Sequence, residues 1–167
     1  MSPEMLPLNG LLKQVRLLEK EKKFNDAALL LLAHATTIIH SQDDPDHMLL
    51  LDYLVRSHGV VLVDNARKEL ESIDPEGALK LAVAQAKYYV SIENPNHALA
   101  LLSNDAALDT LPEAVQSGAW LAKGQALQQL KKHRDAIHYY HKVTVDSPHY
   151  RLAKLNQATA FIRQEWW

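Results

Sequence analysis

The chain has 167 residues, of which 47% are hydrophobic and 23% are charged, and this suits one soluble globular domain with a substantial core. It contains no cysteine, which excludes disulfides and thiol chemistry, and only 5 glycines, which favours helix over strand. The formal charge of −2 gives no general reason to expect a nucleic-acid partner.

The sequence has no evident targeting signal. Its longest apolar run, residues 27–33, is far shorter than the ~20 residues that a membrane-spanning helix needs. The N-terminal residues lack a basic segment followed by an apolar stretch, so no secretory signal is predicted. Together with the missing cysteines, these features favour a cytoplasmic or otherwise intracellular protein without a membrane partner.

The first predicted helix pair covers residues 11–40. Residues 1–10, which include Pro3 and Pro7, are interpreted as a lead-in. From Leu11 onward, apolar residues recur at helical spacing. A polar turn then leads to a second helix that carries Ala27 at a small-residue position.

The second predicted pair covers residues 46–73 and follows a polar loop. Gly59 interrupts its apolar pattern, and residues 60–63 alone would fit a strand. Helix is the preferred interpretation because helical spacing continues after this point. The two helices of the pair would cross at Leu54 and Ala66.

The third and fourth predicted pairs cover residues 76–110 and 117–150. Small residues recur at one fixed offset on both helices of these pairs, Ala86 with Gly124 and Ala98 with Ala136. Equal offsets on both helices indicate a repeat, with about four residues inserted near residues 103–110. A last amphipathic helix is predicted over residues 151–165, where it would cover the apolar surface of the last pair.

Residues 117–150 also carry bulky and small residues at set places, namely Trp120, Gly124, Leu127, Ala136, Tyr140 and Pro148. The small residues allow two helices to cross closely, and the bulky ones fill the space around the crossing. The pattern resembles one tetratricopeptide repeat, a unit of about 34 residues built from two antiparallel helices. The resemblance implies that residues 11–167 form an all-α, right-handed helical-repeat solenoid of about four helix pairs plus a C-terminal closing helix.

The resemblance further implies a protein–protein interaction scaffold, which binds a peptide or a partner subunit in a concave groove. In that family the first helix of each repeat lines the groove. Carried over by register, the groove positions are Leu12, Arg16, Lys20, Lys80, Val83, Lys87, Leu121, Gln125, Gln128 and Gln129. This strip is mildly basic and rich in amides, which suits an acidic or extended peptide. The alternative interpretation is that these residues are ordinary solvent-facing helix positions.

Signatures of catalysis are missing: no GxSxG, no phosphate-binding GxxxxGK[ST] and no GxGxxG occur. We therefore predict no enzyme activity and no cofactor. The alternative function is a metal-binding or enzyme-associated helical domain that uses the cluster from His133 to His141. A structural zinc site normally has four ligands, often including cysteine, so no metal site is predicted.

Four apolar residues gather near the C-terminus: Phe161, Ile162, Trp166 and Trp167. Exposed apolar side chains at the open end of a repeat array favour contact with another protein surface. We therefore predict an association surface here, for a second copy or a further repeat. The alternative is that the two tryptophans fold back onto the last pair and complete its core.

Overall fold

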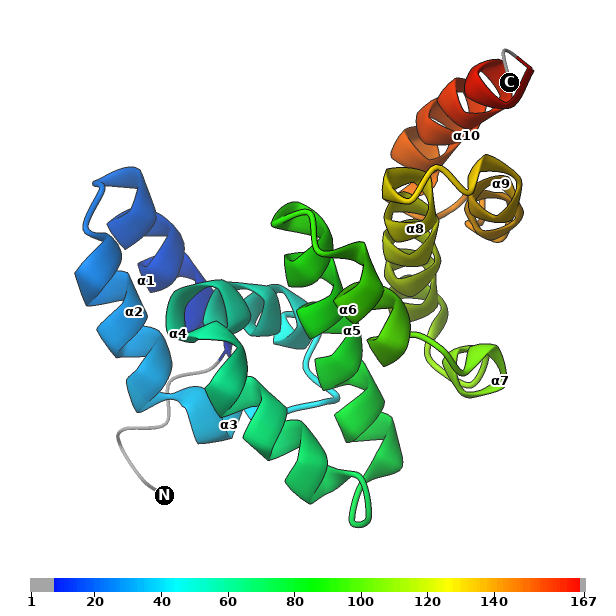
Figure 1. The fold of residues 1–167 in the computed structure, drawn as a ribbon. Coiled ribbons are helices and arrows are strands. Elements are labelled where there is room, and N and C mark those ends of the chain that lie inside the picture. The colour runs from blue at the N-terminus through cyan, green and yellow to red at the C-terminus, as the bar shows by residue number, and fades with distance from the viewer. Residues whose placement is uncertain (1–7, 166–167) are drawn as a thin grey trace. The chain divides into compact units, whose positions relative to one another are not determined.

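The computed structural model describes residues 8–165, apart from the side chains of residues 58–60 and 165. All regular structure in this range is α-helical, so the prediction of an all-α fold is confirmed, including for residues 60–63. The helices are α1 Leu8–Lys20, α2 Phe24–Ala33, α3 Ala35–His40, α4 His47–Leu70, α5 Pro75–Ser91, α6 Pro95–Leu101, α7 Asp105–Leu108, α8 Glu113–Gln129, α9 His133–His141 and α10 Tyr150–Glu165 (Figure 1).

The chain was expected to form one solenoid domain, and its backbone contacts divide it into two compact units. Unit 1 ends at Ala84 and unit 2 begins at Gln85, so the boundary lies within α5. Each unit buries its own set of apolar side chains.

In unit 1, helices α1 to α4 pack against one another. Apolar residues of α1 recur every three or four positions, so Leu8, Leu11, Leu12 and Val15 are buried on one face. Residues 24–40, predicted as one second helix, form the two helices α2 and α3 instead. The two helices meet at His34, whose backbone N–H bonds back to α2 carbonyls.

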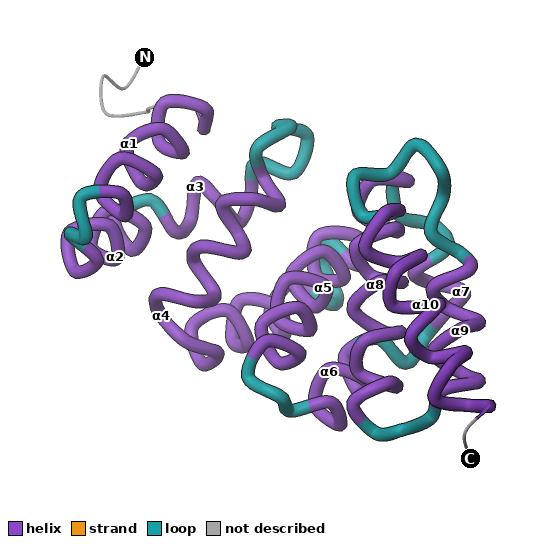
Figure 2. Tube along the Cα trace, turned by 90° about the horizontal axis from the view of Figure 1, so that it is seen from above, coloured by secondary structure: helices purple, strands orange, loops and turns teal. Residues whose placement is uncertain are grey.

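Helix α4 differs most from the sequence-based prediction. Instead of a helix pair over residues 46–73, one helix of 24 residues runs from His47 through Gly59 to Leu70. Its ribbon nevertheless turns sharply part-way along its length (Figures 1 and 2). Sharp helix bends occur at proline and at glycine or serine, and Ser57 and Gly59 lie at the middle of α4. At Gly59, where the apolar pattern of the sequence is interrupted, the chain therefore forms a helix bend and not a loop.

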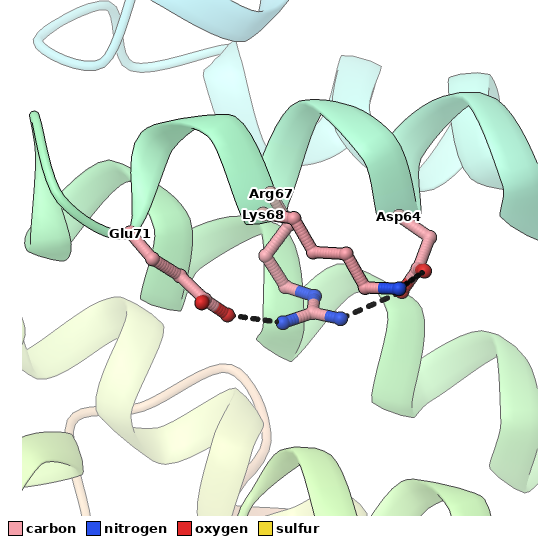
Figure 3. Close-up of polar contacts among 4 residues, drawn as sticks. All are labelled: Asp64, Arg67, Lys68 and Glu71. Atoms are coloured by element: carbon pink, nitrogen blue, oxygen red, sulfur yellow. Dashed lines mark hydrogen bonds and ion pairs between the residues drawn. The ribbon is translucent and has the colours of Figure 1, made fainter.

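The C-terminal half of α4 carries a row of ion pairs along one helix face (Figure 3). The Arg67 guanidinium bonds to Asp64 and to Glu71, each over 2.6 Å. The ammonium of Lys68 adds a 3.0 Å contact to Asp64. Pairs three or four residues apart support a helix by about 0.2–0.5 kcal/mol each, so they reinforce the segment that follows the bend.

In unit 2, α6 packs on α8, α8 packs on α9, and α10 packs on both α8 and α9. Trp120 and Tyr140 are the largest fully buried side chains of its core, with 2% and 0% exposure. The four-residue helix α7 occupies the predicted insertion at 103–110. Its first turn is capped by Asn104, whose side-chain oxygen accepts the Ala107 N–H.

Three helix pairs, α1–α2, α5–α6 and α8–α9, are joined by the same backbone turn. One residue of each turn has positive φ: Lys22 at 61°, Glu93 at 58° and Lys131 at 61°. In each turn, the N–H of the next residue bonds to the carbonyl five positions earlier, over 2.8, 2.8 and 2.9 Å, as in a Schellman motif. Glu93 and Lys131 are separated by the same offset as the small residues of the third and fourth predicted pairs. The backbone therefore repeats in register with the side-chain pattern.

The predicted close crossing of α8 and α9 lies at Gly124. A Cβ atom at Gly124 would collide with ring atoms Cδ1 and Cε1 of Tyr140, so only glycine leaves room for this ring. Ala136 on α9 is fully buried. Gly124 and Tyr140 thus make the close contact expected of a small and a bulky residue at this crossing.

A buried lysine ties α7 to this pair. Lys123 Nζ on α8 donates to the Leu102 carbonyl over 2.8 Å and to Asp105 Oδ1 over 2.5 Å, and the Tyr139 hydroxyl donates to the other Asp105 oxygen over 2.7 Å. Burial alone would raise the pKa of Asp105, but hydrogen bonds from Lys123 and Tyr139 outweigh it and keep that pKa below its ordinary value. Burial and the bond to Asp105 raise the pKa of Tyr139 to about 12, so its hydroxyl remains a donor.

Candidate functional site

The groove positions predicted from the sequence fall into two groups, one with buried and one with accessible side chains. Leu12, Lys80, Val83 and Leu121 have at most 7% of their surface exposed. Lys80 Nζ donates to the Gln42 carbonyl oxygen over 3.2 Å, which accounts for a buried ammonium in unit 1. A side chain buried in this way supports its helix from inside, and we assign no ligand contact to these four residues.

The other six predicted positions have accessible side chains. Arg16 and Lys20 are exposed on α1 of unit 1. Lys87 is half-buried on α5, and Gln125, Gln128 and Gln129 reach the surface on α8 of unit 2. Only the three glutamines are brought together, on one face of one helix.

These three glutamines line a cavity of about 430 Å³ in unit 2, a volume typical of ligand sites. They form its α8 wall. Because residues three and four apart in a helix share a face, the spacing from Gln125 to Gln128 and Gln129 places all three amides on the same side.

The opposite wall belongs to α10 and was not predicted from the sequence. It consists of Asn156, Thr159 and Arg163. Thr159 follows Gln125, and Arg163 follows Gln129, by the length of one tetratricopeptide repeat. Extending the repeat register into the closing helix would therefore have found both residues.

Val90, on α5, also lines the cavity. It precedes Gln128 by the same number of residues that separates Ala86 from Gly124, so it corresponds to Gln128 in the repeat pattern. The Gln129 side-chain amide donates to the Val90 carbonyl oxygen over 3.0 Å. One pair of corresponding residues on α5 and α8, and two pairs on α8 and α10, thus line the same cavity.

Tyr140 holds two of the amides in place. Its hydroxyl donates to Gln128 Oε1 over 2.6 Å, and the Asn156 side chain hydrogen-bonds to the same phenol. Burial raises the pKa of Tyr140, so the phenol stays protonated and able to donate. Because its ring fills the space left by Gly124, the residue that closes the helix crossing also fixes the cavity wall.

The rim of the cavity is positively charged. Lys131 and Arg163 are both exposed, and no carboxylate lines the cavity among the described residues. His133, on α9, also lines it and is nine-tenths buried. Within the described part of the chain, His133 Nδ1 has no hydrogen-bond partner.

Comparison with other proteins identifies no relative: no family, no curated protein and no solved structure matches the chain.

The cluster from His133 to His141, the basis of the metal-binding alternative, is not gathered into a site. His133 is buried, whereas His138 and His141 are exposed on α9, and the His138 ring packs edge-on against Tyr139 at 5.0 Å. Within the described residues, no group of three or more His, Asp or Glu side chains could hold a metal ion.

Near the C-terminus, Phe161 and Ile162 are 48% and 58% exposed on α10. Trp166 and Trp167, the other two residues of the predicted association surface, lie outside the described residues. Within residues 8–165, no helix has both the length and the apolar character needed to span a bilayer.

Proposed function

We propose that the chain is a protein–protein interaction scaffold of the tetratricopeptide type, whose groove binds an extended peptide through the cavity of unit 2. The right-handed helical-repeat solenoid expected over residues 11–167 is part of this proposal. The observation that carries it is the cavity wall, because α8 residues that line it correspond by repeat offset to lining residues of α5 or of α10. An extended peptide suits a surface that repeats along successive helices.

The hydrogen-bonding capacity of the amides supports a peptide ligand. Gln128 uses its oxygen to accept from Tyr140, which leaves its two N–H donors for a ligand carbonyl. Gln129 uses its amide nitrogen on Val90, which leaves its oxygen to accept a ligand N–H. A peptide main chain presents both groups in alternation. Because internal bonds already hold these amides, little side-chain entropy is lost on binding.

Site-specific photo-crosslinking tests the proposal. A photo-reactive phenylalanine analogue would replace Gln125 or Thr159, one on each wall, in the full chain used as bait in a cell extract. The matched control carries the analogue at Ala158, which is exposed on α10 next to Thr159 but does not line the cavity. One residue rotates a helix by about 100°, so the control faces elsewhere.

We expect Gln125 and Thr159 to crosslink to the same short segment of one partner, with the Ala158 control giving little product. Equal yields at all three positions, or crosslinks from the two walls to unrelated proteins, would contradict peptide binding in the cavity.

A further inference from the structure

We infer that the cavity of unit 2 takes an acidic side chain of the bound peptide, so that the partner segment is extended and acidic; this inference rests on the proposed peptide-binding function. The cavity lining suits a carboxylate, since it has cations on its rim and uncharged amides on its walls.

The charge balance of the lining favours a carboxylate. Lys131 lies in the α8–α9 turn and Arg163 near the end of α10, so the two cations approach the cavity from different elements. The described lining residues include no carboxylate that would neutralise them. A site with one sign of charge attracts the opposite charge and increases its local concentration.

The position of Lys131 is set by its backbone. Its φ of 61° belongs to the Schellman turn, in which its N–H bonds to the Gln128 carbonyl over 2.9 Å. The turn therefore fixes the position of the Lys131 backbone, two residues after Gln129. A cation anchored on a rigid turn loses less freedom on binding than one on a mobile loop.

His133 is a second and independent indication of a polar ligand. It lines the cavity, is nine-tenths buried, and its Nδ1 lacks a hydrogen-bond partner among the described residues. Buried polar atoms almost always have a partner, so an unpaired one beside a cavity indicates that a bound group or a water supplies it. The sequence around the cavity also has a net positive charge, because residues 117–167 hold eight Lys or Arg against three Asp or Glu.

Selection from a random dodecapeptide library displayed on phage tests the inference with the full chain as bait. Wild type is compared with the double charge reversal Lys131→Glu and Arg163→Glu. The matched control is Lys132→Glu and Arg151→Glu, which makes the same change of net charge at exposed positions outside the cavity. Both altered pairs lie on the surface, so folding should survive, and circular dichroism would verify this.

We expect wild type and the control to select peptides rich in Asp and Glu, and the cavity variant to lose this preference. One selected peptide, synthesised and labelled, should bind the cavity variant roughly tenfold or more weakly than the control, with reduced dependence on salt. Replacing its acidic residues by Asn and Gln should have the same effect, whereas amidating its C-terminus should have none.

Each other outcome overturns the inference in a recognisable way. If no peptide is enriched, the proposed function fails together with the inference. If peptides are enriched without regard to charge, or if both double variants weaken binding equally, peptide binding stands and the acidic anchor is wrong. Loss of binding on C-terminal amidation would assign the carboxylate to the chain terminus instead of to a side chain.

Discussion

At the scale of single residues, His47 is a titratable group of unit 1 whose protonation depends on folding. It begins α4 and is 2% exposed. Burial lowers its pKa, and the positive charge of Lys80 lowers it further, while a backbone contact at Ile39 and the charge of Asp44 act in the opposite direction. The net lowering means that the folded protein keeps this imidazole neutral at a pH where the unfolded chain protonates it.

This difference predicts that the chain loses stability in mild acid. As the pH falls below about 6.5, the unfolded chain binds a proton that folded His47 does not, which costs about 1.4 kcal/mol for each unit by which the pKa is lowered. We expect the urea midpoint to decrease between roughly pH 7.5 and pH 5.5, and His47→Gln to flatten part of this decrease. His149 in unit 2 also has a pKa lowered by burial, so some pH dependence should remain.

The matched control is His40→Gln, an exposed histidine of the same unit. It should retain the wild-type slope of midpoint against pH. The change of slope is the decisive quantity, because His47→Gln will also shift the midpoint at every pH. An unchanged slope in His47→Gln would show that His47 does not cause the acid sensitivity.

At the scale of elements, the α8–α9 pair connects the repeat pattern to the cavity. The ring of Tyr140 lies against Gly124, and its hydroxyl holds Gln128 and the amide of Asn156. A shift of α9 relative to α8 would therefore change the helix packing and move both cavity walls.

We predict that Gly124→Ala destabilises the chain by about 1–3 kcal/mol, because the added methyl group collides with the Tyr140 ring. The gain in helix propensity, about 1 kcal/mol, acts against this cost and does not cancel it. The control is Gly118→Ala on the same helix, where the new atom would lie 3.2 Å from Cε of Lys87, a flexible side chain. It should be neutral or stabilising. Chemical unfolding followed by circular dichroism measures both, and equal effects would argue against the close crossing.

At the scale of the whole molecule, α10 leaves several large apolar side chains exposed. Leu152, Leu155, Phe161 and Ile162 are all between 43% and 64% exposed. Burying one such side chain is worth roughly 1.5–3 kcal/mol, so a partner surface that covers several would be stabilised substantially. Exposed large apolar side chains are typical of surfaces that contact other proteins.

We predict that the chain associates with itself through the exposed apolar side chains of α10. Sedimentation at several concentrations should show a mass that rises with concentration, and Phe161→Ser with Ile162→Glu should lower it towards the monomer. Val145→Ser, at an isolated apolar residue with 72% exposure, is the control and should behave as wild type. A wild-type chain that stays monomeric at every concentration would contradict the prediction.

The sequence by itself determined the features that arise from neighbouring residues along the chain. Helical spacing identified residues 60–63 as helix despite four β-compatible side chains, because the period continues beyond them. The contact of Gly124 with Tyr140 was predictable for a similar reason. Both residues belong to one helical hairpin, in which a short turn fixes how the two helices meet.

Tertiary structure decided which accessible positions line the cavity. Periodicity assigns a residue to a helix face, but burial of that face depends on helices that are distant in the sequence. Lys80 was therefore expected in a groove, whereas it is buried and bonded to Gln42. Arg163 was not expected in the site, whereas α10 brings it to the cavity one repeat length after Gln129. A cavity exists only where separate elements pack with a gap between them, and no local pattern in the sequence specifies that gap.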